Sequence, residues 1–248
     1  MRELIYGRNA VYECLRAKRR EVFKLLVAEG AQEKGALAQS LQLAASSGKR
    51  IPLQRVSRAQ LDQVSEGHQG VVAEVSGYPY VVLDDILSRL TPQPLFLVLD
   101  CVQDPQNLGT LLRTAEAVGV EGVLIAKDRA AEITPAVVNA SSGATEHLQI
   151  AQVTNIARAL QRLKESDIWV IGLDASRAPG VQDYDTVDLR GPLAIVVGSE
   201  GQGIRRLVRE TCDILVKLPM RGAVSSLNAA VAGSIVLYET LRQRATST

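Results

Sequence analysis

Ile195-Val-Val-Gly-Ser-Glu-Gly-Gln-Gly-Ile204 is the stretch on which the predicted fold depends. It begins as part of an apolar run, which predicts a buried strand, and then turns through three glycines around one acid, Glu200. Two further stretches follow closely, Leu218-Pro-Met-Arg-Gly222 and Ser225-Ser-Leu-Asn228, the latter just ahead of an apolar stretch (229–237) that predicts a helix. Because ligands of open α/β sheets bind outside the carboxyl ends of strands, we expect the three stretches to converge on one crevice.

The chain ahead of these stretches alternates predicted strands with predicted helices. Leu95-Phe-Leu-Val-Leu-Asp100 is apolar up to its final acid, which is typical of a parallel strand covered on both faces. Further strands are predicted over 120–126, 148–153 and 168–173, and an irregular loop over 174–188. This order predicts an α/β domain with a mostly parallel sheet over residues 94–248.

The N-terminal part predicts a separate, smaller α/β unit over residues 1–77, joined by a linker at 78–93. The 248 residues carry a net charge of only +1, but 12 Lys/Arg and 8 Asp/Glu give residues 1–77 a net of +4. Such a basic lobe favours an anionic partner. We predict that basic residues near its first helix contact RNA: Arg8, Arg16, Lys18, Arg19 and Arg20. The alternative is that the basic run is only a solvated helix end.

Several kinds of site are absent from the sequence pattern. The three cysteines and two histidines show no metal-binding spacing, so we expect neither a disulfide framework nor a metal. The chain opens without the apolar region of a signal peptide, and no apolar run is long enough to span a membrane, so we expect a cytoplasmic protein.

The glycine-rich turn does not fit the common nucleotide motifs. Gly198-Ser-Glu-Gly-Gln-Gly203 has the spacing GxxGxG instead of GxGxxG, and no acid follows at the distance expected for a ribose. A P-loop and a GxSxG nucleophile turn are also missing. Dinucleotide-binding, P-loop and serine-hydrolase readings are therefore disfavoured.

Taken together, the motifs resemble those of the SpoU/TrmH family of RNA ribose 2′-O-methyltransferases, in the SPOUT superfamily. The resemblance rests on Asp104-Pro-Gln-Asn-Leu-Gly109 with Arg113-Thr-Ala115, followed by the three stretches quoted above. Ile5-Tyr-Gly-Arg-Asn-Ala-Val11 and His68-Gln-Gly-Val-Val-Ala73 also resemble the ribosomal-protein-like substrate-binding domain of this family. The match is strongest to the branch whose substrate is a guanosine ribose in large-subunit (23S) ribosomal RNA.

The resemblance implies a trefoil knot in the C-terminal domain, a homodimer formed through it, and S-adenosylmethionine as methyl donor without a metal. It also implies two sets of site residues. Those implied in catalysis are Arg113, Asn107, Glu200, Ser226 and Asn228, and those implied in donor binding are Gly198, Gly201, Leu218, Met220 and Leu227. A guanidinium keeps its proton near neutral pH, so we assign Arg113 to the phosphate and the developing alkoxide rather than to a general base.

Two other functions stay open at this point. One is a catalytically idle RNA-binding or ribosome-assembly factor with the same fold, which the intact polar motif residues disfavour. The other is the same chemistry on transfer RNA, which the sequence does not separate from ribosomal RNA.

Overall fold

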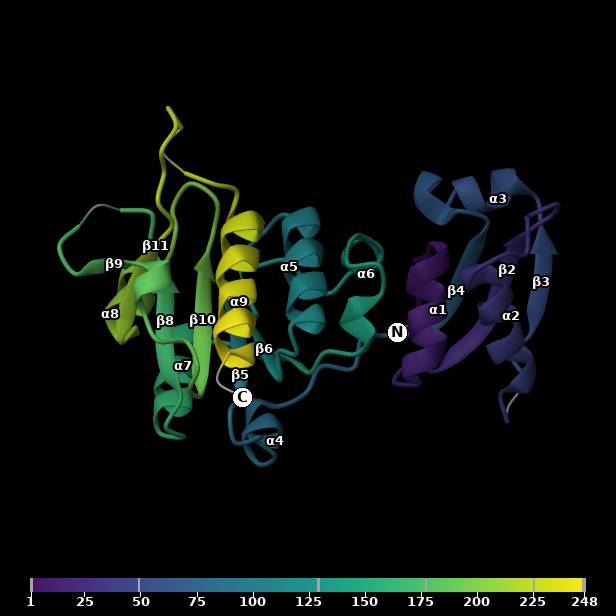
Figure 1. The fold of residues 1–248 in the computed structure, drawn as a ribbon. Coiled ribbons are helices and arrows are strands. Elements are labelled where there is room, and N and C mark those ends of the chain that lie inside the picture. Colours follow the sequence, from purple (N-terminus) through teal and green to yellow (C-terminus); the bar gives the residue numbers. More distant parts are fainter. Residues whose placement is uncertain (1, 49, 129, 177, 225, 247–248) are drawn as a thin grey trace. The chain divides into compact units, whose positions relative to one another are not determined.

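The chain forms two compact units (Figure 1), and the computed structural model describes residues 2–48, 50–128, 130–176, 178–224 and 226–246. The N-terminal unit contains the chain up to residue 79 together with residues 133–147. The C-terminal unit contains residues 80–132 and the chain from residue 148 onward. This division differs from the predicted one at residues 133–147, which we had placed in the methyltransferase domain.

A four-stranded sheet forms the centre of the N-terminal unit. Its order is β1-β4-β2-β3, with β4 antiparallel to both β1 and β2, and β3 parallel to β2. The first three strands of the chain therefore run in the same direction. Its elements are β1 (Arg2–Tyr6), α1 (Arg8–Ala17), β2 (Val22–Ala28), α2 (Ala36–Ser46), β3 (Leu53–Val56), α3 (Arg58–Asp62), the short helix η1 (Glu66–His68), β4 (Val71–Ser76), α6 (Pro135–Ala140) and the short helix η2 (Ala144–Glu146).

Two glycines allow residues 133–147 to pack closely against the start of the chain. A side chain on Gly7 would lie 2.4 Å from the Asn139 amide nitrogen, and one on Gly143 would lie 2.7 Å from Glu13 Cβ. Both glycines also have positive φ, at 94° and 86°, where other residues are strained. Asn139 Nδ2 donates to the Tyr6 carbonyl at 3.0 Å. Sequence periodicity gives no sign of this packing, because it joins segments far apart in the chain.

The C-terminal unit is built on a seven-stranded sheet in the order β7-β6-β5-β10-β8-β11-β9, in which all the paired strands are parallel. Its elements are α4 (Leu83–Leu87), β5 (Leu95–Asp100), α5 (Pro105–Ala117), β6 (Gly122–Ala126), β7 (Ile150–Val153), α7 (Ile156–Lys164), β8 (Trp169–Leu173), β9 (Val181–Asp183), the short helix η3 (Tyr184–Thr186), β10 (Leu193–Gly198), α8 (Arg206–Thr211), β11 (Ile214–Lys217) and α9 (Ala229–Ala245). The predicted fold class, an α/β domain with a mostly parallel sheet beside a smaller α/β domain, is confirmed.

Helices cover both faces of this sheet. Alternate side chains of β5 and β10, such as Phe96 and Val196, are buried against α4, α7 and α8. On the other face α5 and α9 pack together (Figure 1), where Gly233 lets α9 approach Leu111 of α5 and Val197 of β10. Burial on both faces is why β5 and β10 read as continuous apolar runs.

The element order changes direction beside β5. From β5 the chain adds β6 and β7 on one side, and then returns to build β8, β10 and β11 on the other side. Such a switch point leaves a crevice beyond the carboxyl ends of the strands, which is where doubly wound sheets bind ligands. The short strand β9 lies in the segment predicted as a loop, because three edge residues paired with β11 give no apolar pattern. The implied trefoil knot stays a prediction.

Candidate active site

The three C-terminal motif stretches line one cavity of about 410 Å³ at the carboxyl ends of β8, β10 and β11 and the start of α9. We call it the glycine-loop cavity. It is lined by the predicted donor-binding residues Gly198, Gly201, Leu218, Met220 and Leu227, and also by Glu200, Ser226 and Asn228. Ser225 lies outside the described residues. The expected convergence of the three stretches is therefore confirmed.

Asn107, Glu200 and Asn228 form a hydrogen-bonded triangle beside this cavity. Asn107 Nδ2 donates to Glu200 Oε1 at 2.7 Å, and Asn228 Nδ2 donates to the same oxygen at 2.5 Å. Asn228 Nδ2 also lies 2.9 Å from Asn107 Oδ1, which accepts from it. One carboxylate oxygen thus joins three motif residues that are far apart in the chain.

Local helix geometry places two corners of the triangle. Asn228 caps α9: its Oδ1 accepts from the backbone N–H groups of Ala230 and Val231 at 2.9 and 3.2 Å, so its amide nitrogen is left to point toward Glu200. Asp104 caps α5 in the same way, with Pro105 at the first helical position, and this places Asn107 on the first turn. Both asparagines are therefore held by the starts of long helices.

The third corner is held by a folded-back loop. Ser199 and Gly203 exchange two backbone hydrogen bonds at 3.1 and 2.9 Å, which close the glycine-rich turn around Glu200. A side chain on Gly198 would lie 2.1 Å from the Gly203 carbonyl carbon. Gly198, which the resemblance implies in donor binding, lines the cavity, but a Cβ at this position would meet the loop's own backbone. Gly201 and Gly203 have positive φ, at 81° and 65°, which the turn requires.

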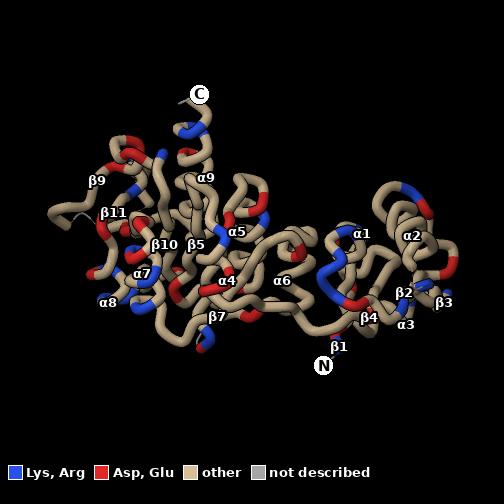
Figure 2. The backbone as a smooth tube through the Cα atoms, turned by 90° about the horizontal axis from the view of Figure 1, so that it is seen from below, with Lys and Arg blue, Asp and Glu red and all other residues tan. Residues whose placement is uncertain are grey.

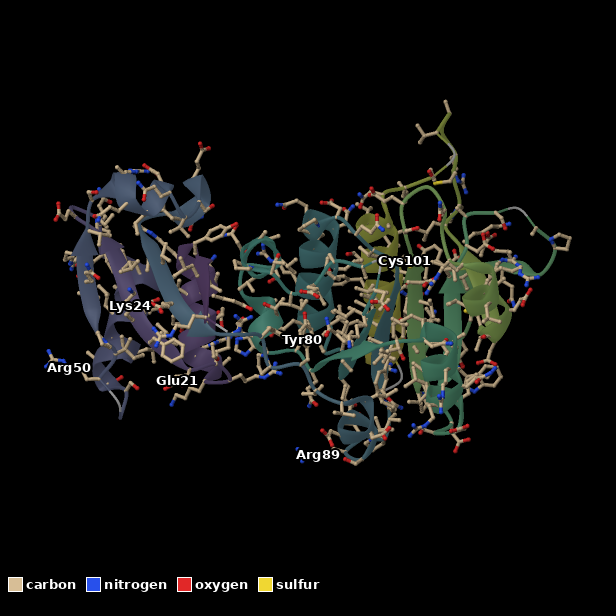
Figure 3. All side chains as sticks on the ribbon, turned by 180° about the vertical axis from the view of Figure 1, so that it is seen from behind. Glu21, Lys24, Arg50, Tyr80, Arg89 and Cys101 are labelled. Carbon is tan, nitrogen blue, oxygen red and sulfur yellow. The ribbon has the colours of Figure 1, made fainter. Side chains whose placement is uncertain are left out.

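A fully buried acid, Asp100 at the end of β5, anchors the far end of this loop. One carboxylate oxygen accepts the backbone N–H of Arg205 at 2.8 Å, and the other faces the Arg205 guanidinium at 2.6 to 2.8 Å. The pair raises the pKa of Arg205, chiefly through this hydrogen bond. The next residue, Cys101 (labelled in Figure 3), has a φ of 64°. The sequence showed only an acid at a strand end, so the role of Asp100 in loop placement was not predicted.

A second carboxylate, Asp174, lines the glycine-loop cavity at the end of β8. Arg209 Nε donates to one of its oxygens at 2.6 Å, and the Ser176 backbone N–H donates to the other at 2.8 Å. The pKa of Asp174 is lowered: its partial burial opposes this shift, and these hydrogen bonds outweigh that burial. Asp174 was predicted only as the first residue of a loop.

Comparison with known proteins supports the motif resemblance. A model of the SpoU rRNA methylase family matches residues 94–238, and a model described as RNA 2′-O ribose methyltransferase substrate binding matches residues 4–81. The chain belongs to the SpoU rRNA methylase family. Within that family it is an RNA 2′-O-methyltransferase.

Individual SpoU relatives cover nearly the whole chain. It is 48% identical to the putative TrmH family tRNA/rRNA methyltransferase YacO of Bacillus subtilis, over 98% of this chain and 96% of that protein. It is 44% identical to the 23S rRNA (guanosine-2′-O-)-methyltransferase RlmB of Pseudomonas putida, over 98% and 97%. The crystal structure of the SpoU methyltransferase AviRb from Streptomyces viridochromogenes, 26% identical, superposes with a TM-score of 0.81 over 99% of this chain and 91% of that one.

The AviRb structure is a complex with the cofactor AdoMet. The predicted methyl donor, S-adenosylmethionine, is thereby confirmed at the level of the SpoU family. In this chain the glycine-loop cavity fits such a group, because its volume lies within the roughly 300–1,000 Å³ of small-molecule sites. Its lining combines apolar residues such as Leu218 and Leu227 with the acids Asp174 and Glu200. Among the described residues, no three His, Cys, Asp or Glu side chains gather as a metal site would need.

Among the described residues, Arg113 is a predicted SpoU site residue that does not line the glycine-loop cavity. It is exposed on α5, six residues beyond Asn107. Six helical positions rotate a side chain to a different face of the helix from Asn107. Its assigned role at the ribose and phosphate therefore stays a prediction.

The predicted RNA contacts of the N-terminal unit lie in unlike environments. Lys18 and Arg16 are exposed, and Arg16 Nε pairs with Glu13 at 2.7 Å. Arg19 donates to the carbonyls of Pro79 and Glu146 at 3.2 and 3.4 Å. Arg8 is half-buried, with Nε donating to the Gln69 carbonyl at 3.0 Å.

Arg20 does not fit the prediction of RNA contact. Its guanidinium is fully buried, donates to Glu3 at 2.8 Å and lies 3.3 Å from Glu146, which is also fully buried. Burial raises the pKa of Glu146, and the nearby arginines oppose that shift. A buried charge must be paired, so Arg20 is a structural cation inside the unit. We therefore withdraw it from the set of RNA contacts.

Proposed function

We propose that this SpoU enzyme methylates the 2′-oxygen of a guanosine ribose in large-subunit (23S) ribosomal RNA. The observation that carries the proposal is the triangle of Asn107, Glu200 and Asn228 at the edge of the glycine-loop cavity. It couples polar groups suited to a ribose with a cavity suited to the methyl donor. The 44% identity with an enzyme named for guanosine methylation in 23S rRNA favours the substrate.

When bound, S-adenosylmethionine supplies an electrophilic methyl group on a positively charged sulfur. The bond that forms joins this carbon to the ribose 2′-oxygen, the S–CH₃ bond breaks, and the hydroxyl proton leaves to solvent. The leaving group is a good one, so the protein has mainly to align the reacting atoms. Gly198, Leu218 and Leu227 line the cavity from three separate segments, and we assign them to holding the donor in one orientation.

The triangle serves the ribose side in this proposal. Glu200 Oε1 already accepts two amide hydrogens, which fixes the carboxylate where a ribose hydroxyl can donate to its other oxygen. Ser226, exposed at the cavity edge, adds a hydroxyl next to the start of α9. Arg113 binds the adjacent phosphate and stabilises the developing alkoxide, because its guanidinium stays charged.

The other partners follow from the same proposal. A ribosomal RNA substrate places the enzyme in the cytoplasm, and we propose that two copies associate as the family resemblance implies. In the described part of the chain, no helix has both the length and the apolar character needed to span a bilayer. The named relative YacO leaves transfer RNA as the alternative substrate.

One experiment tests the proposal and separates the two RNA classes. Purified protein is incubated with methyl-labelled S-adenosylmethionine and, separately, protein-free 23S rRNA and bulk transfer RNA, and 2′-O-methylated nucleosides are quantified by mass spectrometry. We expect 2′-O-methylguanosine in 23S rRNA, with EDTA present throughout. Label in transfer RNA alone would move the enzyme to the alternative class, and no label in either RNA would contradict the proposal.

A further inference from the structure

We propose that Arg221 binds a phosphate of the RNA substrate beside the nucleotide that is methylated. This inference rests on the proposed function, because it assigns a contact to the RNA that the enzyme modifies. Arg221 lies on the segment of residues 218–228 that joins β11 to α9, which we call the β11–α9 loop. It has no role among the predicted catalytic or donor-binding residues.

The β11–α9 loop borders the glycine-loop cavity at both of its ends. Leu218 and Met220 line the cavity ahead of Arg221, and Ser226 to Asn228 line it afterwards. Between these ends the loop extends beyond the carboxyl ends of the strands (Figure 1). Arg221 is therefore an exposed residue of a loop that starts and ends at the candidate active site.

The exposed part of this loop carries two side chains suited to a nucleotide. Arg221 takes part in no hydrogen bond or ion pair with the residues that the structure describes. Val224, three residues further on, is 67% exposed. RNA is recognised mainly in loops and single strands, where an unstacked nucleotide offers both a phosphate and an apolar base face. A cation and an apolar side chain on one loop match that combination.

The ion pairs of the C-terminal unit distinguish Arg221 from other cations near the cavity. Three of those cations are each paired with an acid at 2.6 to 3.9 Å: Arg205 with Asp100, Arg209 with Asp174 and Lys217 with Asp183. Acidic and basic residues alternate around α8, β9 and β11 in Figure 2, so the number of cations does not show which charge is available. The charge of Arg221 stays unpaired among the described residues.

A phosphate beside this cavity needs a cation, because the cavity itself is acidic. Glu200 and Asp174 both line it, and a phosphate brought next to two carboxylates is repelled unless a positive charge offsets them. A guanidinium stays charged and binds phosphate oxygens with paired hydrogen bonds. Arg221 supplies such a charge next to the cavity.

Arg113 and Arg221 lie on different sides of the glycine-rich turn. Arg113 is on α5, which follows β5, and Arg221 follows β11, while the glycine-rich turn follows β10, which lies between those two strands in the sheet. A ribose within an RNA chain has a phosphate on each side. We assign one of these phosphates to Arg113 and the other to Arg221. Two such contacts fix the register of the target nucleotide, since phosphate contacts position the nucleic acid.

Arg206 provides a matched control for Arg221. It is an exposed arginine at the start of α8, 3.8 Å from the exposed Glu210, and it is not among the described residues that line the cavity. Full-length Arg221→Ala, Arg221→Lys and Arg206→Ala proteins are titrated with protein-free 23S rRNA at several salt concentrations. Single-turnover methylation is measured over a range of RNA concentrations, donor binding by calorimetry with S-adenosylmethionine, and oligomeric state by light scattering.

We expect Arg221→Ala to weaken RNA binding about fivefold and to reduce the salt dependence by roughly one counterion. The RNA concentration that gives half-maximal methylation should rise by the same factor, and the rate should recover at saturating RNA. Arg221→Lys should lose only part of the affinity, because lysine keeps the charge without the planar fork. Arg206→Ala should bind RNA within about twofold of the wild type. Donor affinity should be unchanged in all three variants.

An RNA affinity of Arg221→Ala within about twofold of the wild type, or equal weakening by Arg221→Ala and Arg206→Ala, overturns the phosphate contact while leaving methylation of 23S rRNA intact. Weaker donor binding by Arg221→Ala places the side chain at the donor and overturns it as well. A changed oligomeric state with unchanged RNA affinity identifies a second copy of the chain as the partner of Arg221, which also contradicts the contact. Failure of the wild-type protein to bind or methylate that RNA contradicts the proposed function instead.

Discussion

Two segments are prominent in the sequence: the glycine-rich turn of residues 198–203 in the C-terminal unit, here called the glycine loop, and the basic run of the N-terminal unit (Arg16 to Arg20). Their side chains differ in whether they reach the partners that the sequence suggested. In the glycine loop, Glu200 accepts hydrogen bonds from two other predicted site residues, Asn107 and Asn228. In the basic run, nearby cations lie in different environments: Lys18 is exposed and Arg20 is buried. Turn-forming and capping residues act on the backbone within a few residues, so a sequence motif is enough to predict them. The position of a long charged side chain depends instead on the acid, distant in sequence, with which it pairs.

The sharpest test of this difference is Arg20→Met. The substitution leaves Glu146 buried without its cation, and breaking a buried pair costs about 3–5 kcal/mol. Urea unfolding of the full chain should show this loss. The matched variant Lys18→Met, on an exposed side chain of the same run, should change stability by less than about 0.5 kcal/mol. Equal effects would mean that Arg20 is not the structural cation of the run.

The next largest effect is expected from substitutions at Arg113. They test whether methylation at the glycine-loop cavity depends on a residue that does not line this cavity. Arg113→Ala and Arg113→Lys should each lose about 3 kcal/mol of transition-state stabilisation, roughly a hundredfold in single-turnover methylation at saturating RNA. The affinity for S-adenosylmethionine should stay within about twofold. A near-normal single-turnover rate for Arg113→Ala would remove this residue from the mechanism.

Asp100→Asn tests whether the glycine loop is positioned by its buried acid. Asparagine keeps the shape but loses the charge that two groups of Arg205 share, at a cost of about 2 kcal/mol. We expect weaker binding of S-adenosylmethionine, by roughly tenfold, since the loop lines the cavity. Asp188→Asn, which breaks an exposed pair with Arg190, is the control and should be close to neutral. Unchanged donor affinity in Asp100→Asn would show that the loop holds its shape without the clamp.

The smallest expected effect comes from Asn228→Ser, which separates capping from the triangle. Serine still caps α9, so stability should fall by no more than about 0.5 kcal/mol. The donor to Glu200 is lost, and the methylation rate should fall about tenfold, which corresponds to one hydrogen bond to a charged group. A large loss of stability with an unchanged rate would reverse the assignment and make Asn228 a cap alone.

The sequence by itself determined the fold class and which three C-terminal stretches meet at the glycine-loop cavity. Continuous apolar strands such as Leu95–Asp100 signal burial on both faces, and that pattern belongs to parallel α/β sheets. Glycine, proline and asparagine act within a few residues of their own position, so the motifs predicted which stretches meet at the strand ends. The capping role of Asn228 was accessible for the same reason.

Only the tertiary structure decided the contacts between distant segments. Residues 133–147 joined the N-terminal unit because Gly7 and Gly143 leave room for them, and no local pattern records such complementarity. The burial of Arg20 depends on Glu146, and the placement of Arg8 depends on Gln69. Charge is a property of the residue, but its availability to RNA is a property of its neighbours, since a paired and buried guanidinium is no longer free to bind phosphate.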